Sequence, residues 1–321
     1  MTRRFLARDT PNSDPGRARR SRLFGREARA FAVAWSTSLL TGCIPGPATS
    51  PKQMRSLERF TYGVPELGLS VSALRAGDPG APRLVYVHGT PGDATAFADD
   101  LRDPIPGFEA VSIDRPGFGQ TAPTDGSKPV PLPSFEDQAR AIEPLLTERR
   151  ERWPVLIGHS LGGPIVARVA ADQPGRVGAV VILSGSLDPE LEEPKWFNHA
   201  ADTWLTRRLI GRAMRHSNDE ILAAPEQTRR LRRVLANVRC PVLIIHGTED
   251  GLVPVENVDY MTRVFAHVDR VEVVILEGEG HFIPWTQRDL IRRKLSEFLG
   301  PSWSDAHTDT ASSVGTSPAT R

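Results

Sequence analysis

The chain contains little cysteine, with only Cys43 and Cys240 among its 321 residues. A disulfide framework needs several pairs of cysteines, so this composition excludes a small secreted domain held together by disulfides. An excess of charge is also missing, since 40 lysines and arginines face 39 acidic residues. With 39% hydrophobic residues, the chain can bury the core of one large domain or of two ordinary ones.

The charge that is present is unevenly distributed. Residues 1–29 contain nine arginines against Asp9, Asp14 and Glu27, so the rest of the chain is slightly acidic. The basic character therefore belongs to the amino-terminal segment, and the composition gives no support to nucleic-acid binding by the folded part.

An uncharged stretch, residues 30–43, follows directly on the arginines. At about 13 apolar or small residues it is too short to span a bilayer, but basic residues followed by a short apolar run are the order of an export signal. Its end, Leu40-Thr41-Gly42-Cys43, resembles a bacterial lipobox, whose cysteine is lipidated and becomes the new amino terminus. We therefore expect residues 1–42 to be a lipoprotein-like signal peptide.

On this interpretation the protein is exported from a bacterial cell and is periplasmic or anchored to a membrane through a lipid on Cys43. The alternatives are an ordinary leader with a coincidental cysteine, or a cytoplasmic protein if the leader is not a signal. Residues 43–57 are rich in proline and small residues and are expected to be a linker that does not pack. Residues 58–300 are the predicted folded domain, and residues 301–321 have the composition of a disordered tail.

A run of strand-forming residues ends abruptly within residues 155–163, VLIGHSLGG, and passes into a helix-compatible run. Ser160 is thus placed on a tight strand-to-helix turn, where Gly158 and Gly162 leave room for the backbone. A serine on such a corner is a candidate nucleophile, whereas the alternative is a glycine-rich turn that only packs. Because a serine hydroxyl is a weak nucleophile, the first interpretation requires a base and a group that orients the base.

The rest of the folded part alternates strand-like and helix-like segments. Two stretches with alternating apolar and polar residues, 59–62 and 69–74, predict an edge hairpin. Continuous apolar runs, typical of buried parallel strands, occur at 84–88, 110–113, 155–159, 177–183, 242–245 and 271–276. Helical spacing occurs at 134–149, 255–267 and 287–299. The pattern predicts an α/β fold with a mostly parallel, doubly wound sheet.

One stretch, residues 185–239, lacks any strand-like run. Helices inserted there, between two late strands, would form a cap over the carboxyl ends of the sheet, where open α/β sheets bind ligands. We expect the cap's large aromatic residues to bury it against the core, with contact to the substrate as the alternative; these are Trp196, Phe197 and Trp204. We also expect several of its arginines to share the solvated face of one helix, with contact to an anionic membrane as the alternative; these are Arg208, Arg212 and Arg215.

Candidate partners for Ser160 follow two later strands. Glu249 and Asp250 come shortly after the run 242–245, and His281 comes shortly after the run 271–276. Because the carboxyl ends of parallel strands meet at one edge of a sheet, these side chains are expected near Ser160.

The order serine, acid, histidine, each placed after a strand, resembles the α/β-hydrolase family. The resemblance covers about residues 58–300 and includes several short motifs. These are HGTPG at 88–92, DRPGFG at 114–119, GHSLG at 158–162, GTED at 247–250 and GHF at 280–282.

The resemblance implies a role for each residue of the candidate site. Ser160 matches the family's nucleophile and His281 its general base. The family's acid is the third residue after the glycine of the GTED motif, which selects Asp250 over Glu249. The acid would hold the imidazole in the correct tautomer and stabilise its charged form.

The family also stabilises a tetrahedral oxyanion with two backbone N–H groups. Leu161, which follows the nucleophile, matches one donor, and the HGTPG loop supplies the other. Pro91 has no N–H, so the resemblance points to Thr90 as the second donor. Each such donor is typically worth about 3 kcal/mol in the transition state.

These residues predict a hydrolase that cleaves a carboxylic ester of a small-molecule substrate, without a cofactor and without a metal. A serine at position 160 disfavours the dehalogenase and epoxide hydrolase branches, which need a carboxylate nucleophile. Alternatives on the same triad are an amidase or aminopeptidase, a cofactor-free perhydrolase and a C–C bond hydrolase. An alternative of another class is a surface-anchored binding protein that keeps the fold but has lost catalysis.

Overall fold

The computed structural model describes residues 45–129, 132, 134–300 and 303. The predicted signal peptide, the predicted lipidation site Cys43 and most of the predicted tail lie outside these residues. All the elements described below belong to one compact unit that begins at Pro47.

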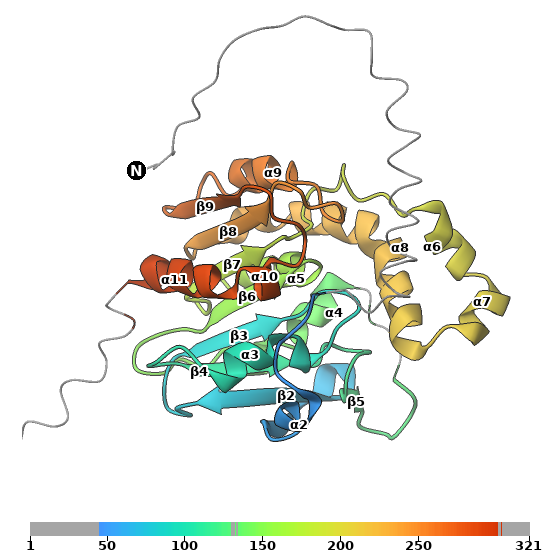
Figure 1. The fold of residues 1–321 in the computed structure, drawn as a ribbon, viewed down its shortest axis with the longest axis horizontal. Coiled ribbons are helices and arrows are strands. Elements are labelled where there is room, and N and C mark those ends of the chain that lie inside the picture. The colour runs from blue at the N-terminus through green and yellow to red at the C-terminus, as the bar shows by residue number, and fades with distance from the viewer. Residues whose placement is uncertain (1–44, 130–131, 133, 301–302, 304–321) are drawn as a thin grey trace, which may run out of the picture. The chain divides into compact units, whose positions relative to one another are not determined.

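The described residues form a single sheet of nine strands, with β1-β2-β4-β3-β6-β7-β8-β9 as its path and β5 paired to β2 (Figure 1). The strands are β1 (Glu58–Val64), β2 (Leu69–Gly77), β3 (Arg83–Val87), β4 (Glu109–Ile113), β5 (Ala122–Pro123), β6 (Val155–His159), β7 (Ala179–Leu183), β8 (Val242–Gly247) and β9 (Val271–Leu276). Strands β1 and β2 pair antiparallel at one edge, whereas the pairs from β4 through to β9 are all parallel. The predicted edge hairpin and mostly parallel sheet are therefore confirmed.

Helices cover both faces of the sheet, as predicted. Alternate residues of each buried strand point to opposite faces, and they enter two separate clusters of the core. Helices α4, α5 and α9 pack on one face, and α3, α10 and α11 pack on the other. The helices are α2 (Pro51–Met54), α3 (Ala98–Arg102), α4 (Phe135–Arg140), α5 (Gly162–Asp172), α6 (Trp196–Ala201), α7 (Trp204–Leu209), α8 (Arg212–Arg232), α9 (Asn257–Val264), α10 (Ile283–Thr286) and α11 (Arg288–Leu299).

Two predicted elements differ from the structure. The helix expected over 134–149 ends as α4 at Arg140 and continues only as a 3-10 turn at Glu143–Leu145. Pro144 lies in that turn, and a proline lacks the N–H that a helix interior requires. Strand β9 is not fully buried, because it forms an edge of the sheet and leaves Val273 and Ile275 about 40% exposed.

The predicted cap is present between β7 and β8 as α6, α7 and α8 (Figure 1). The expectation that its aromatic residues are buried was wrong for two of them, since Trp196 is 75% exposed and Trp204 is 71% exposed. The expectation that Arg208, Arg212 and Arg215 share one face of a single helix was also wrong. The chain leaves helical geometry at Ile210, which has an extended backbone, and α8 begins only after Gly211.

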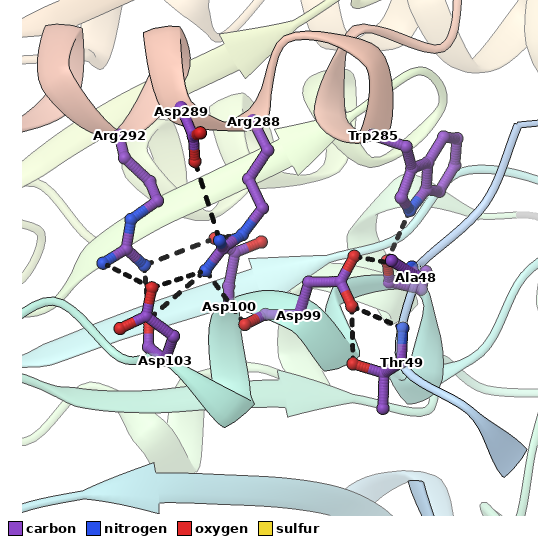
Figure 2. Close-up of polar contacts among 10 residues, drawn as sticks. Ala48, Thr49, Asp99, Asp100, Asp103, Trp285, Arg288, Asp289 and Arg292 are labelled. Atoms are coloured by element: carbon purple, nitrogen blue, oxygen red, sulfur yellow. Dashed lines mark hydrogen bonds and ion pairs between the residues drawn. The ribbon is translucent and has the colours of Figure 1, made fainter. Parts of the chain in front are cut away.

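Residues 48–54 pack on the domain, although the sequence predicted an unpacked linker. The carboxylate of Asp99 accepts hydrogen bonds from the backbone N–H groups of Ala48 and Thr49, at 2.8 and 2.7 Å (Figure 2). Ser50 then caps the short helix α2. The predicted tail also has a packed residue, because the Trp303 ring stacks on Phe108 with centroids 6.2 Å apart.

Asp100, beside Asp99, is not a surface charge. It is 8% exposed and forms ion pairs with Arg288 and Arg292 of α11, at 3.2 and 3.8 Å (Figure 2). Burial raises the pKa of Asp100 to about 6, although the two arginines oppose this shift. The cluster joins α3 to α11 on the same face of the sheet.

Within the described residues, none of the helices is both long enough and apolar enough to cross a membrane.

Candidate active site

Ser160 lies on the turn between β6 and α5, with a left-handed backbone at φ 54°. Its N–H donates to the carbonyl of Leu183 on β7, at 2.9 Å, which fixes the turn on the sheet. A β-carbon at Gly158 would lie 2.2 Å from the Gly162 carbonyl oxygen, and one at Gly162 would lie 2.2 Å from the Val87 carbonyl oxygen. Only glycine fits at both positions, which agrees with the reason that the sequence suggested for them.

Asp250 and His281 come together at the same edge of the sheet, after the neighbouring strands β8 and β9. The Asp250 Oδ2 and His281 Nδ1 atoms are 2.8 Å apart, and both residues are buried. The other oxygen of Asp250 accepts hydrogen bonds from the backbone N–H groups of Leu252 and Val253. Glu249 is exposed, so the structure brings Asp250 and not Glu249 to the histidine.

The charge state of Asp250 determines the tautomer of His281. Burial raises the pKa of Asp250, but hydrogen bonds from His246, His281 and the Val253 backbone outweigh this and hold it well below its usual value. An ionised carboxylate only accepts hydrogen bonds, so the neutral His281 carries its proton on Nδ1. Its Nε2 then has a free lone pair and can accept a proton.

His159, the residue before Ser160, holds the His281 loop against the turn. Its Nε2 lies 3.0 Å from the His281 carbonyl oxygen, and the two imidazole rings are 4.8 Å apart. Burial, followed by the neighbouring His281, lowers the pKa of His159 to about 3, so this ring is neutral and donates to the carbonyl. The indole of Trp285 meets the same ring edge-on at 5.3 Å.

Ser160 Oγ makes no hydrogen bond to His281 within the described part of the chain. Contacts of this kind are often long in free enzymes and tighten when substrate binds. The structure therefore brings the acid and the base together, and it places Ser160 one residue after the histidine that packs on the base.

The two expected oxyanion donors flank Ser160. A β-carbon at Gly89 would lie 2.8 Å from Ser160 Cβ, so the backbone just before Thr90 runs against the serine. Leu161 is the N-cap residue of α5, where backbone N–H groups have no partner within the helix. Within residues 45–129 and 134–300, neither Thr90 N–H nor Leu161 N–H donates to a protein acceptor.

The sequence did not indicate which groups hold the Gly89 carbonyl. This oxygen lies 2.7 Å from His88 Nδ1 and 2.8 Å from an Arg115 nitrogen. Arg115 is fully buried and pairs with Glu220 of α8 at 2.6 Å. The DRPGFG motif could have drawn attention to Arg115, but no local pattern marks Glu220, 105 residues further along the chain.

A surface pocket of about 720 Å³ lies elsewhere. It is lined by residues from the 48–53 segment, from α3 and from 285–293, and it contains none of Ser160, Asp250 and His281. Among the residues that the structure describes, no group of three or more His, Cys, Asp or Glu side chains could hold a metal ion.

Comparisons with known proteins agree with this architecture. Residues 84–293 match the model of a family described as "Alpha/beta hydrolase family". The chain is 24% identical to the 2-hydroxy-6-oxononadienedioate/2-hydroxy-6-oxononatrienedioate hydrolase of Cupriavidus pinatubonensis, over 69% of this chain and 88% of that protein.

Two solved structures show the same fold. A membrane phospholipase A, described as a bacterial virulence factor, is 21% identical with a TM-score of 0.58, over 86% of this chain and 96% of that one. The monoacylglycerol lipase of Paleococcus ferrophilus is 21% identical with a TM-score of 0.54, over 71% of this chain and 98% of that one.

Proposed function

Because the chain belongs to the α/β-hydrolase family, we propose that it is a serine hydrolase that cleaves a carboxylic ester through an acyl-enzyme. The observation that carries the proposal is the convergence of Ser160, Asp250 and His281 on one sheet edge, with Asp250 Oδ2 and His281 Nδ1 2.8 Å apart. A binding protein would need neither the acid–base pair nor a strained serine beside it.

In the proposed mechanism His281 Nε2 takes the proton of Ser160 Oγ as that oxygen attacks the acyl carbon. The carbonyl oxygen becomes an oxyanion, which the N–H groups of Thr90 and Leu161 stabilise. When the intermediate collapses, the ester bond breaks and His281 gives its proton to the leaving alcohol. Water then attacks the acyl-enzyme by the same steps, while Asp250 stabilises each imidazolium without taking its proton.

A fluorophosphonate probe, which phosphonylates an activated serine, tests this proposal. We expect wild type to incorporate one label and the Ser160→Ala variant to incorporate none. Ser184 offers a matched control, because it follows the next strand, has a left-handed backbone at φ 46° and is fully buried. Labelling of Ser184→Ala should equal that of wild type. A folded wild type that takes no label, or equal labelling of Ser160→Ala, would show that Ser160 is not the nucleophile.

The bond that is cleaved is a separate question. We favour an ester because a serine nucleophile and two oxyanion donors are sufficient for it. The relative from C. pinatubonensis favours a C–C bond hydrolase as the second candidate. Kinetics on a substrate panel distinguishes the two candidates. The panel contains p-nitrophenyl esters of increasing chain length, together with amide, peptide and vinylogous diketone analogues. A kcat/KM that is highest on a diketone would reject the proposal of an ester hydrolase.

We propose that the chain is exported and anchored to a membrane through a lipid on Cys43. The support is the sequence Leu40-Thr41-Gly42-Cys43 after a basic, then uncharged, segment. The variant Cys43→Ser should release the protein from the membrane fraction and lose incorporated fatty acid. Cys240→Ser is the matched control, since Cys240 is the only other cysteine and is buried. Unchanged fractionation of Cys43→Ser would contradict the proposal.

A further inference from the structure

The peptide bond between Gly89 and Thr90 joins two groups with different partners. A peptide unit is planar, so a constraint on the Gly89 carbonyl also orients the Thr90 N–H at the other end of the same plane. The carbonyl accepts two hydrogen bonds, from His88 Nδ1 at 2.7 Å and from Arg115 Nη2 at 2.8 Å. The Thr90 N–H is therefore aimed by groups that do not touch it.

The protonation of His88 suits this arrangement. Its Nε2 accepts the backbone N–H of Arg115 at 3.2 Å, so Nδ1 carries the proton that the Gly89 carbonyl receives. Burial, and then the nearby Arg115 charge, hold the pKa of His88 well below its usual value. A neutral ring with one donor and one acceptor satisfies both contacts.

Arg115 is held in turn by the cap. Its guanidinium is fully buried and forms a bidentate pair with Glu220 of α8, at 2.6 and 3.0 Å. The nitrogen that reaches the Gly89 carbonyl, Nη2, is also bonded to Glu220. A buried guanidinium without a counter-charge is strongly unfavourable, so the position of Arg115 depends on Glu220.

Helix α8 contacts the turn 114–119 along one face. Residues four apart on a helix lie on the same side, and three residues of α8 at this spacing reach the turn. Arg212 donates to the Gly119 carbonyl at 3.1 Å, His216 Nδ1 lies 2.8 Å from the Gly117 carbonyl, and Glu220 binds Arg115. Gln138 of α4 adds a hydrogen bond to Glu220 at 2.8 Å. The cap helix is thus bonded to the residues that fix the Gly89 carbonyl.

We propose that Arg115 and Glu220 are positioning residues, which align the Thr90 N–H for the developing oxyanion and couple that alignment to the seating of α8 on the domain. The inference rests on the proposed serine-hydrolase function. It adds to that function a connection between the cap and the rate of the chemical step.

The same two strands provide a matched control at their other ends. Arg83 begins β3 and Glu109 begins β4, and they form an ion pair at 2.6 Å that is 12% and 2% exposed. Arg83 and Glu109 are register partners at the amino ends of β3 and β4, whereas Gly89 and Arg115 follow the carboxyl ends of the same strands. A general requirement for buried ion pairs would affect both sites equally.

The experiment compares two double variants, Arg115→Met/Glu220→Leu and Arg83→Met/Glu109→Leu, with wild type. Removing both charges of the Arg115–Glu220 pair leaves no unpaired buried charge, so this protein retains its fold more readily than a single variant would. In the control, Arg149, which also pairs with Glu109, loses that partner but keeps its contact with solvent, since its side chain is partly exposed. Arg115→Lys is the second test variant, because a lysine keeps the charge but cannot bind Glu220 and the Gly89 carbonyl with a planar fork.

The readouts are kcat and KM on a p-nitrophenyl ester, and Ki for a trifluoromethyl ketone. This inhibitor accepts Ser160 Oγ at its carbonyl and forms a tetrahedral adduct whose oxyanion occupies the donor site. For Arg115→Met/Glu220→Leu we expect kcat to fall by about 30- to 100-fold, KM to change by less than about threefold, and Ki to rise as kcat falls, since one oxyanion donor is misaligned. The Arg83→Met/Glu109→Leu variant should keep kcat and Ki within about threefold of wild type.

Three results would overturn the inference: a folded Arg115→Met/Glu220→Leu variant with unchanged kcat and Ki, a loss of the same size in the control, or a change confined to KM. If Arg115→Met/Glu220→Leu does not fold, Arg115→Lys decides by the same criteria. Failure of the proposed function itself would be seen with the wild-type protein, which would then show no Ser160-dependent turnover and no adduct with the inhibitor. In that case the amide chemical shift of Thr90, measured by NMR, still tests the alignment. We expect it to change in Arg115→Met/Glu220→Leu and not in Arg83→Met/Glu109→Leu, and an unchanged shift in the first variant would refute the inference.

Discussion

The carboxyl edge of the sheet and the cap are built in different ways. At the sheet edge, the candidate catalytic residues follow β6, β8 and β9, and Gly158, Gly162 and Gly247 at this edge leave no room for a β-carbon. In the cap, α8 is held by polar bonds to the domain and by buried Leu231, whereas α6 and α7 present exposed side chains; these are Trp196, Trp204 and Leu209. We therefore expect the sheet edge to tolerate almost no added side-chain volume at these glycines. The outer cap, helices α6 and α7, should tolerate large changes in side-chain volume.

This contrast separates positioning from access. The groups that would perform the chemistry follow strands whose register is set by the core, so we expect their geometry not to depend on α6 and α7. A buried connection between the two regions runs from α8 through Arg115 to the Gly89 carbonyl. Substitutions in each region should accordingly have effects of different kind and size.

The largest expected effect is on activity, at the sheet edge. Asp250→Asn should lower kcat by about 10⁴-fold, because an amide in this place favours the wrong tautomer of His281. The adjacent Glu249→Gln is the control and should change kcat by less than about threefold, since Glu249 is exposed. Steady-state kinetics on a p-nitrophenyl ester measures both, and equal losses in the two variants would remove the distinction between Asp250 and Glu249.

The next effect is on stability at the same edge. Gly162→Ala places a β-carbon 2.2 Å from the Val87 carbonyl oxygen, so the backbone must move. We expect a loss of at least about 3 kcal/mol in the free energy of unfolding, measured with urea. The cap residue Gly211 has open space around its position, and Gly211→Ala should cost at most about 1 kcal/mol. Similar losses for the two variants would contradict the proposed rigidity of the edge.

A smaller, pH-dependent effect is expected where the chain enters the cap. Burial raises the pKa of Glu192 to about 7; a hydrogen bond with Ser186 opposes the shift and the nearby Asp188 adds to it. The folded state binds this proton more tightly than the unfolded state, so the free energy of unfolding falls as pH rises from about 4.5 to about 7.

Glu192→Gln removes this dependence. It should be more stable than wild type by about 1–2 kcal/mol at pH 8 and no more stable at pH 4, with the effect reduced by partial solvent contact. Urea unfolding at both pH values measures the difference. The exposed neighbour Glu190 is the control, and Glu190→Gln should follow the wild-type profile. A Glu192→Gln profile parallel to that of wild type would show that Glu192 titrates normally.

The smallest effect is expected in the outer cap. Trp204 is 71% and Leu209 is 78% exposed, so the double variant Trp204→Ser/Leu209→Ser should change the free energy of unfolding by about 0.5 kcal/mol or less. Leu231 of α8 is fully buried, and Leu231→Ser should cost at least about 3 kcal/mol. A large loss in the double variant would mean that α6 and α7 pack more closely than their exposure indicates.

The same contrast explains what the sequence could predict. Strands such as β6 and β8 are continuous apolar runs that end in small or polar residues, so both the sheet and the order of Ser160, Asp250 and His281 at its edge could be predicted. Helical periodicity in the cap indicates helices but not their partners, and therefore the exposure of Trp196 and Trp204 could not be foreseen.

Contacts between residues that are far apart in the sequence could not be predicted, for the same reason. Nothing in the residues around Glu220 shows that it meets Arg115, and nothing around Asp99 shows that it binds the backbone of Thr49. Both contacts depend on tertiary packing, which brings together segments that have no shared pattern.

The central claim is that Ser160 forms an acyl-enzyme. Rapid mixing with a p-nitrophenyl ester, followed by intact-mass and peptide mass spectrometry, tests it most directly. We predict a burst of one p-nitrophenolate per chain, with the acyl mass on the peptide that contains Ser160 and no burst in Ser160→Ala. Turnover by wild type with no acyl mass, or with the acyl group on another residue, would contradict the claim.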